Sequence, residues 1–204
     1  MQLDIDFIFY SSIIILFLIP LYIYREKVFA FVYKKGDISL FVKDVKLHMQ
    51  NEHPKIKIDY SIIERTKDEK DIRIRETLIV EDIVSQFFFY NYTKNTQSDI
   101  SRDKHWSGYE EKSKTNEKYP NDWPIRKDFA WKREEGKCNR CGNKITLDNT
   151  FTTFVKDIKN GGGYNFENII ILCSDCNKVL NTQNPKNTIS SLALNEKLMF
   201  FVHS

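Results

Sequence analysis

The chain has 204 residues, of which 41% are hydrophobic and 29% charged, and its net charge is +3. This length is enough for one sizeable domain or two small ones. The small net charge excludes a strong overall positive field, so composition alone does not indicate a nucleic-acid partner.

An uncharged apolar run occupies residues 7–24. As a helix it would be about 27 Å long, close to the hydrocarbon thickness of a bilayer. Asp4 and Asp6 precede the run, and basic residues come after it: Arg25, Lys27, Lys34 and Lys35. The positive-inside rule places the C-terminal remainder of the chain in the cytoplasm. We therefore predict a single-pass transmembrane anchor and juxtamembrane helix over residues 1–35, with a buried core helix as the alternative.

Residues 36–92 predict a small α+β module. One helix should follow Asp37, with Phe41, Val45 and Met49 on one face, and another should span about residues 72–90. Between them, apolar and polar residues alternate over residues 56–62, which is typical of a half-buried strand. No cysteine or acidic cluster accompanies His48 and His53, so they are interpreted as ordinary surface or packing residues. A protein partner could bind this module.

Residues 93–121 are polar and charged, which predicts a linker. A short helix should follow over residues 125–135, opened by Pro124 and closed by Gly136. Four of its residues are basic: Arg126, Lys127, Lys132 and Arg133. The basic face is either simply solvated or in contact with phosphates.

All four cysteines of the chain fall into two C-x-x-C pairs, at 138–141 and 173–176. Each pair can direct two thiolates at one ion, and two pairs complete a tetrahedral zinc site. Two disulfides or four free thiols are the alternatives. This spacing favours one structural Zn²⁺ bound by Cys138, Cys141, Cys173 and Cys176.

Two stretches around these pairs resemble HNH endonuclease domains. Residues 131–142, WKREEGKCNRCG, are similar to the basic helix and C-x-x-C-G knuckle that open such domains. Residues 161–177, GGGYNFENIIILCSDCN, are similar to the glycine turn, asparagine, apolar strand and second cysteine pair of their other half. The resemblance covers about residues 122–181.

The resemblance implies a ββα-metal unit of the treble-clef type within a zinc domain over residues 122–204. It implies that Asn168 is the residue that orients the catalytic loop and Asn177 the last motif position. Asp157 falls where the general-base histidine is expected, and Lys156 where a catalytic metal ligand is expected. A carboxylate is a much weaker base than imidazole near neutral pH, so the implied catalytic set of Asp157, Asn168 and Asn177 is atypical.

The overall prediction is an α+β protein comprising a transmembrane anchor, a middle module and an HNH-like zinc domain. It would bind or cleave DNA at the cytoplasmic face of a membrane, with Mg²⁺ or Mn²⁺ if it cleaves and with Lys156 as a further phosphate contact. The alternative is a non-catalytic, zinc-stabilised module that binds nucleic acid or protein.

Overall fold

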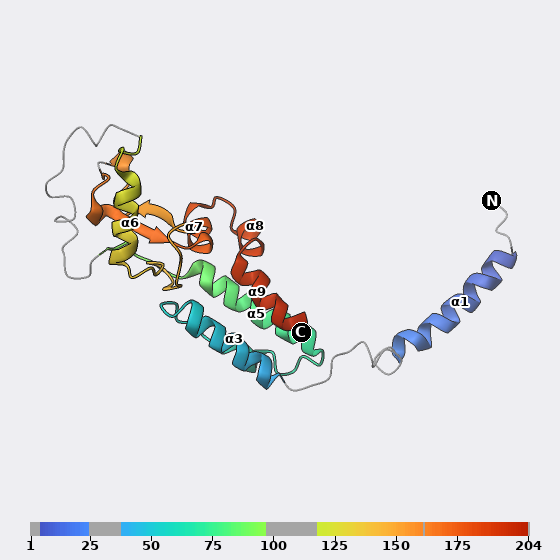
Figure 1. Ribbon diagram of the computed structural model, residues 1–204. Helices are drawn as coiled ribbons and strands as arrows, with labels where there is room; N and C mark the ends of the chain where they lie inside the picture. The colour runs from blue at the N-terminus through green and yellow to red at the C-terminus, as the bar shows by residue number, and fades with distance from the viewer. Residues whose placement is uncertain (1–4, 25–37, 97–117, 161, 204) are drawn as a thin grey trace.

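The computed structural model describes residues 5–24, 38–96, 118–160 and 162–203 (Figure 1). Within them, helices surround one small antiparallel sheet, which confirms the predicted α+β class. The helices are α1 (Ile5–Ile23), α3 (Ser39–Glu52), α4 (Ile62–Arg65), α5 (Ile72–Phe89), α6 (Trp123–Arg133), α7 (Ser174–Asn181), α8 (Pro185–Ser190) and α9 (Ala193–His203). The strands are β1 (Phe151–Phe154) and β2 (Ile169–Leu172), and two 3₁₀ turns, η3 (Ile158–Asn160) and η4 (Phe166–Asn168), lie between them.

The apolar run near the start is helical as α1, which stands apart from the other helices in Figure 1. No helix in the four described ranges has both the length and the apolar character of a membrane span. The predicted transmembrane anchor is therefore not supported. The basic flank on which its orientation depended, residues 25–35, lies outside the described residues.

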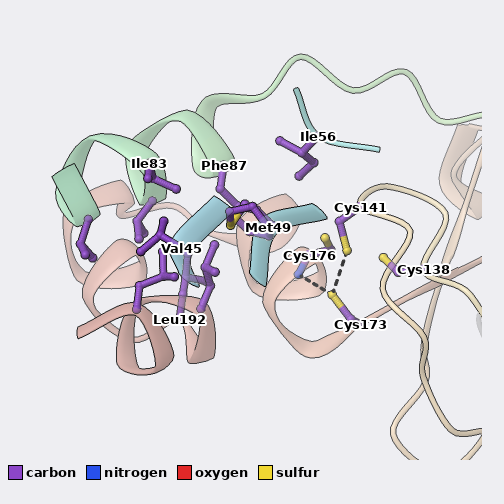
Figure 2. Packing of buried hydrophobic residues seen from close by; sticks show 14 of the residues in the cluster. Val45, Met49, Ile56, Ile83, Phe87, Cys138, Cys141, Cys173, Cys176 and Leu192 are labelled. Carbon is purple, nitrogen blue, oxygen red and sulfur yellow. Dashed lines mark hydrogen bonds between the residues drawn. The ribbon is translucent and has the colours of Figure 1, made fainter. Parts of the chain in front are cut away.

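Three helices form the main apolar core (Figures 1 and 2). Phe41, Val45 and Met49 are buried on α3, one turn apart, so they form a single stripe. α5 begins at an N-cap, Asp71, whose carboxylate accepts a hydrogen bond from the backbone N–H of Arg73 at 2.9 Å. The C-terminal helix α9 packs against both α3 and α5 and was not predicted.

The sheet is a hairpin in which Phe151 pairs with Leu172 and Phe154 with Ile169. Every residue of β2 is buried, and its two faces belong to different clusters. Ile170 and Leu172 join the helical core, whereas Ile169 and Ile171 pack with Ala130 of α6. Because side chains alternate along a strand, β2 connects the two clusters.

The core is shared between regions that the sequence predicted separately. Residues of the predicted module 36–92 and of the predicted zinc domain 122–204, including the four cysteines, lie in one buried cluster. The predicted strand over residues 56–62 is wrong, because this segment is irregular and then enters α4. Ile56 is buried in the helical core without any ladder partner, so its alternating pattern reflects packing and not pairing.

Candidate functional site

The first cysteine pair sits in a tight turn of the backbone. The N–H of Gly142 donates to the carbonyl of Cys138 at 2.8 Å, and the N–H of Cys138 donates to the carbonyl of Asn143 at 2.8 Å. Gly142 has a φ of +83°, and a Cβ atom there would lie 2.9 Å from the Pro54 side chain. Glycine is therefore required here by backbone conformation and by space. The turn directs both thiols of the pair inward, where they are fully buried.

The second pair lies at the start of α7. Cys173 is the N-cap of this helix, and its Sγ accepts a hydrogen bond from the N–H of Cys176 at 3.4 Å. Backbone N–H groups and the helix dipole favour negative charge at such a position. The helix start thus holds Cys173 and Cys176 side by side, one helical turn apart.

The four sulfurs form one buried cluster (Figure 2). They lie within 4.8 Å of one another, and Cys141 Sγ is 3.7 Å from Cys173 Sγ. No disulfide joins them. A tetrahedron of zinc–sulfur bonds has sulfur–sulfur edges of about 3.8 Å. The donor set and its spacing therefore fit a structural zinc ion and exclude the disulfide alternative.

Proton sharing inside the cluster gives its members unequal acidity. Hydrogen bonds, first from Cys141, lower the pKa of Cys138. The hydrogen bond to Cys138 raises the pKa of Cys141 and of Cys176, and burial raises both further. Without a cation Cys141 and Cys176 would therefore keep their protons, and four thiolates can coexist here only around a cation, which a divalent metal would supply.

Arg140, inside the first pair, is a residue that sequence reasoning missed. It is only 1% exposed, and its guanidinium donates to the carbonyls of Phe87 at 2.6 Å and Phe88 at 3.3 Å. It also donates to Cys176 Sγ at 3.6 Å and lies 4.9 Å from the centre of the Phe87 ring. One cation thus binds the C-terminal carbonyls of α5 and the cysteine cluster together. Nothing in the sequence around Arg140 indicates that this residue, inside a C-x-x-C pair, would contact the end of α5.

Asn168 holds together the loop that connects β1 to η4. Its side chain is fully buried. Its Oδ1 accepts from the N–H of Lys156 at 2.8 Å, and its Nδ2 donates to the carbonyls of Lys156 at 2.9 Å and Gly163 at 2.7 Å. One amide thus fixes the backbone at Lys156 and Gly163, on either side of Asp157.

Asp157 itself is exposed on this loop. Its side chain is 62% exposed, and its carboxylate lies 3.9 Å from the ammonium of Lys94. Asn177, on α7, makes its side-chain hydrogen bond at 2.9 Å with Asn181 of the same helix. The structure therefore links Asn168 to the Asp157 loop, whereas the described bonds of Asn177 stay within α7.

The basic residues of α6 are used in part for the fold itself. Arg133 donates to the carbonyls of Phe166 and Ile169, each at 2.6 Å, and its side chain is only 12% exposed. Arg126 donates to the carbonyl of Tyr164 at 2.8 Å and pairs with Asp122 at 2.9 Å. Lys132 pairs with Asp128 at 2.7 Å and is exposed, and Lys127 is half-buried. Of the predicted phosphate contacts, Arg133 is thus primarily a brace between α6 and the hairpin.

The histidines do not supply a base within the motif. Residues 138–183 contain no histidine. His53 is buried against the ring of Phe87, and burial lowers its pKa to about 4, so the residue is neutral near pH 7. His105 lies outside the described residues.

Comparison with protein-family models finds a match to HNH endonuclease over residues 138–183. The matched stretch contains both cysteine pairs, the β1–β2 hairpin and α7. Searches of curated proteins and of solved structures find no significant match. Together, the match and the buried cysteine cluster support an HNH-type domain around residues 138–183, with four thiols placed to hold a metal ion.

Proposed function

We propose that the HNH-type domain binds DNA and hydrolyses its phosphodiester bonds slowly. The Asn168 side chain carries this proposal, because it holds the loop of Asp157 through three hydrogen bonds of 2.7–2.9 Å. The buried Asn168 amide holds the backbone of Lys156, and the next residue, Asp157, exposes its carboxylate. A loop held in this way is more typical of a positioned functional group than of a simple turn.

Asp157 would be the anionic group of this site. Its exposed carboxylate is a hard oxygen ligand, and Mg²⁺ is commonly held by one or two carboxylates and water. Such an ion, when bound, stabilises the charge that develops on the phosphate. Without an imidazole, proton removal from water would depend on a weak base, and loss of a general base typically costs ~10²–10⁴-fold in rate.

The second candidate is a zinc-stabilised binding module without cleavage. Two observations favour it: the matched segment has no histidine, and the Asp157 carboxylate faces the ammonium of Lys94. In this case the domain would still bind nucleic acid through its cations, or the predicted module of residues 36–92 would bind a protein through the helices α3 and α5.

A nicking assay separates the two candidates. The full chain would be incubated with supercoiled plasmid and Mg²⁺ or Mn²⁺, beside Asp157→Ala and the matched control Asp148→Ala, which removes an exposed carboxylate from the same domain. Slow nicking that Asp157→Ala abolishes and Asp148→Ala retains is the expected result. Binding without nicking would select the second candidate, and nicking that survives Asp157→Ala would place the catalytic group elsewhere.

The cellular location at the cytoplasmic face of a membrane stays a prediction from the sequence. Fractionation of cells expressing the full chain, followed by an alkaline carbonate wash, tests it. Release of the full-length chain into the soluble fraction would contradict membrane insertion.

A further inference from the structure

The segment after α5 runs in an extended form along the HNH-type domain. Its residues alternate in exposure: Tyr92, Lys94 and Thr96 are half-buried, whereas Asn91, Thr93 and Asn95 are exposed. This two-residue period places one set of side chains against the domain. We call residues 90–96 the strap.

The strap is anchored on both sides of Lys94. Before it, the hydroxyl of Tyr92 donates to Oδ1 of Asn139 in the first cysteine turn. Directly after it, the carbonyl of Asn95 accepts from Nδ2 of the same Asn139 at 3.0 Å. After it, the hydroxyl of Thr96 donates to the carbonyl of Glu167 at 2.7 Å. Burial raises the pKa of Tyr92, so its hydroxyl remains a neutral donor. These anchors fix the path of the strap independently of the Lys94 side chain.

The strap thereby places the Lys94 ammonium beside Asp157 in the candidate site. The Lys94 ammonium lies 3.9 Å from the Asp157 carboxylate, and the two side chains are 30% and 62% exposed. A pair this long and this exposed contributes little to folding. The Lys94 ammonium can therefore leave the Asp157 carboxylate and bind another anion with little loss of free energy. A divalent cation bound at Asp157 would repel the ammonium and so favour this change of partner.

We propose that Lys94 is a phosphate-binding residue of the HNH-type site, supplied from outside the matched segment by the strap. The inference rests on the proposed function and adds the phosphodiester backbone of DNA as the ligand that Lys94 contacts. Lys94 would also replace Arg133 as a phosphate contact, because the Arg133 guanidinium already binds the carbonyls of Phe166 and Ile169. Sequence reasoning assigned this lysine to a linker, because the contact with Asp157 joins positions far apart in the chain.

Fluorescence anisotropy with a labelled DNA duplex tests the proposal on the full chain. Lys94→Ala would be compared with Lys94→Arg and with Lys144→Ala, which removes an exposed lysine near the first cysteine turn. Losing one phosphate contact should weaken binding by about tenfold near 50 mM salt and reduce the slope of log affinity against log salt by about 1. Lys94→Arg should retain binding, and thermal melts should confirm that all variants are folded.

A second variant separates a positioned cation from a general surface charge. Tyr92→Phe removes one anchor of the strap and leaves Lys94 in place, so it should weaken binding by a few-fold if the position of Lys94 matters. Equal binding by Lys94→Ala and Lys144→Ala would overturn the inference while the proposed function stands. Wild-type binding by Tyr92→Phe would overturn the positioning by the strap. Absence of DNA binding by the wild-type chain would overturn the proposed function and this inference with it.

Discussion

The cysteine cluster and the loop of Asp157 belong to the same HNH-type domain but are held in opposite ways. Each of the four cysteines is buried, and Arg140 connects the cluster to the end of α5. Asp157 is 62% exposed, and its carboxylate lies 3.9 Å from the ammonium of Lys94. The backbone around it is fixed by Asn168, and the carboxylate remains accessible to solvent and ligands.

This difference separates residues that determine stability from those available for chemistry. Buried polar groups are costly unless they are satisfied, so changes at the cluster should unfold the protein. Exposed charges contribute little to folding, so changes at Asp157 should alter only function. Substitutions in the cysteine cluster should therefore lower stability, substitutions at Asp157 should lower activity, and control substitutions should change neither.

The largest effect is expected from loss of the metal. Structural zinc binds with an apparent free energy of about 10–16 kcal/mol, which is comparable to the whole stability of a typical domain. Cys176→Ser should therefore abolish zinc binding and unfold the HNH-type domain, and the shared core should transmit part of the loss to α3, α5 and α9. Zinc analysis and far-ultraviolet circular dichroism measure this, with Ser174→Ala as control. A folded, zinc-free Cys176→Ser protein would contradict the assignment.

Arg140 should come next. Arg140→Met leaves the carbonyls of Phe87 and Phe88 without their donor in a buried environment. Leaving a buried acceptor without its donor typically costs about 1–3 kcal/mol, and this substitution leaves both carbonyls without theirs. Chemical denaturation should show that loss, with a smaller one for Arg140→Lys, which keeps the charge on a shorter donor. An unchanged midpoint for Arg140→Met would show that the cluster and α5 are held together by other contacts.

Within the loop, Asn168 should behave like the cysteine cluster and not like its neighbour Asp157. Asn168→Ala removes three hydrogen bonds from a fully buried side chain and should lower the free energy of unfolding by about 2–3 kcal/mol. Asn160→Ala, an exposed change in the same loop, is the control and should be close to neutral. The comparison fails if both variants unfold at the same denaturant concentration.

The smallest effect on stability is expected at Asp157 itself. Asp157→Ala removes an exposed carboxylate and one long ion pair, so the unfolding free energy should change by less than about 0.5 kcal/mol. Denaturation curves should superimpose on those of Asp148→Ala. A loss as large as that of Asn168→Ala would mean that Asp157 has a structural role.

Local signals in the sequence predicted much of the fold. Helices with a single apolar stripe, such as α3, and helices with clear ends, such as α6 after Pro124, were predicted within a few residues. The C-x-x-C spacing predicted the cysteine cluster because a tetrahedral ion imposes that geometry on short turns. The hairpin and the start of α7 were expected from the resemblance.

Contacts between distant segments were not predictable. Arg140 contacts the end of α5, and Lys94 contacts Asp157. Both contacts join residues far apart in the sequence, and a hydrophobic pattern along one helix or strand contains no information about them. The alternation at residues 56–62 indicated a strand, but a strand needs a partner, and β1 and β2 pair only with each other among the described strands. The partition into residues 36–92 and 122–204 likewise gave no indication that α9 would complete the core of α3 and α5.

The position of α9 also constrains the order in which this protein can fold during synthesis. Phe41 near the start of the core and Val202 near the end of the chain belong to the same buried cluster. The apolar stripes of α3 and α5 therefore stay partly uncovered on the ribosome until α9 has been translated. Because contacts so distant in sequence form slowly and leave apolar surface exposed meanwhile, nascent chains that lack α9 should depend on chaperones or aggregate.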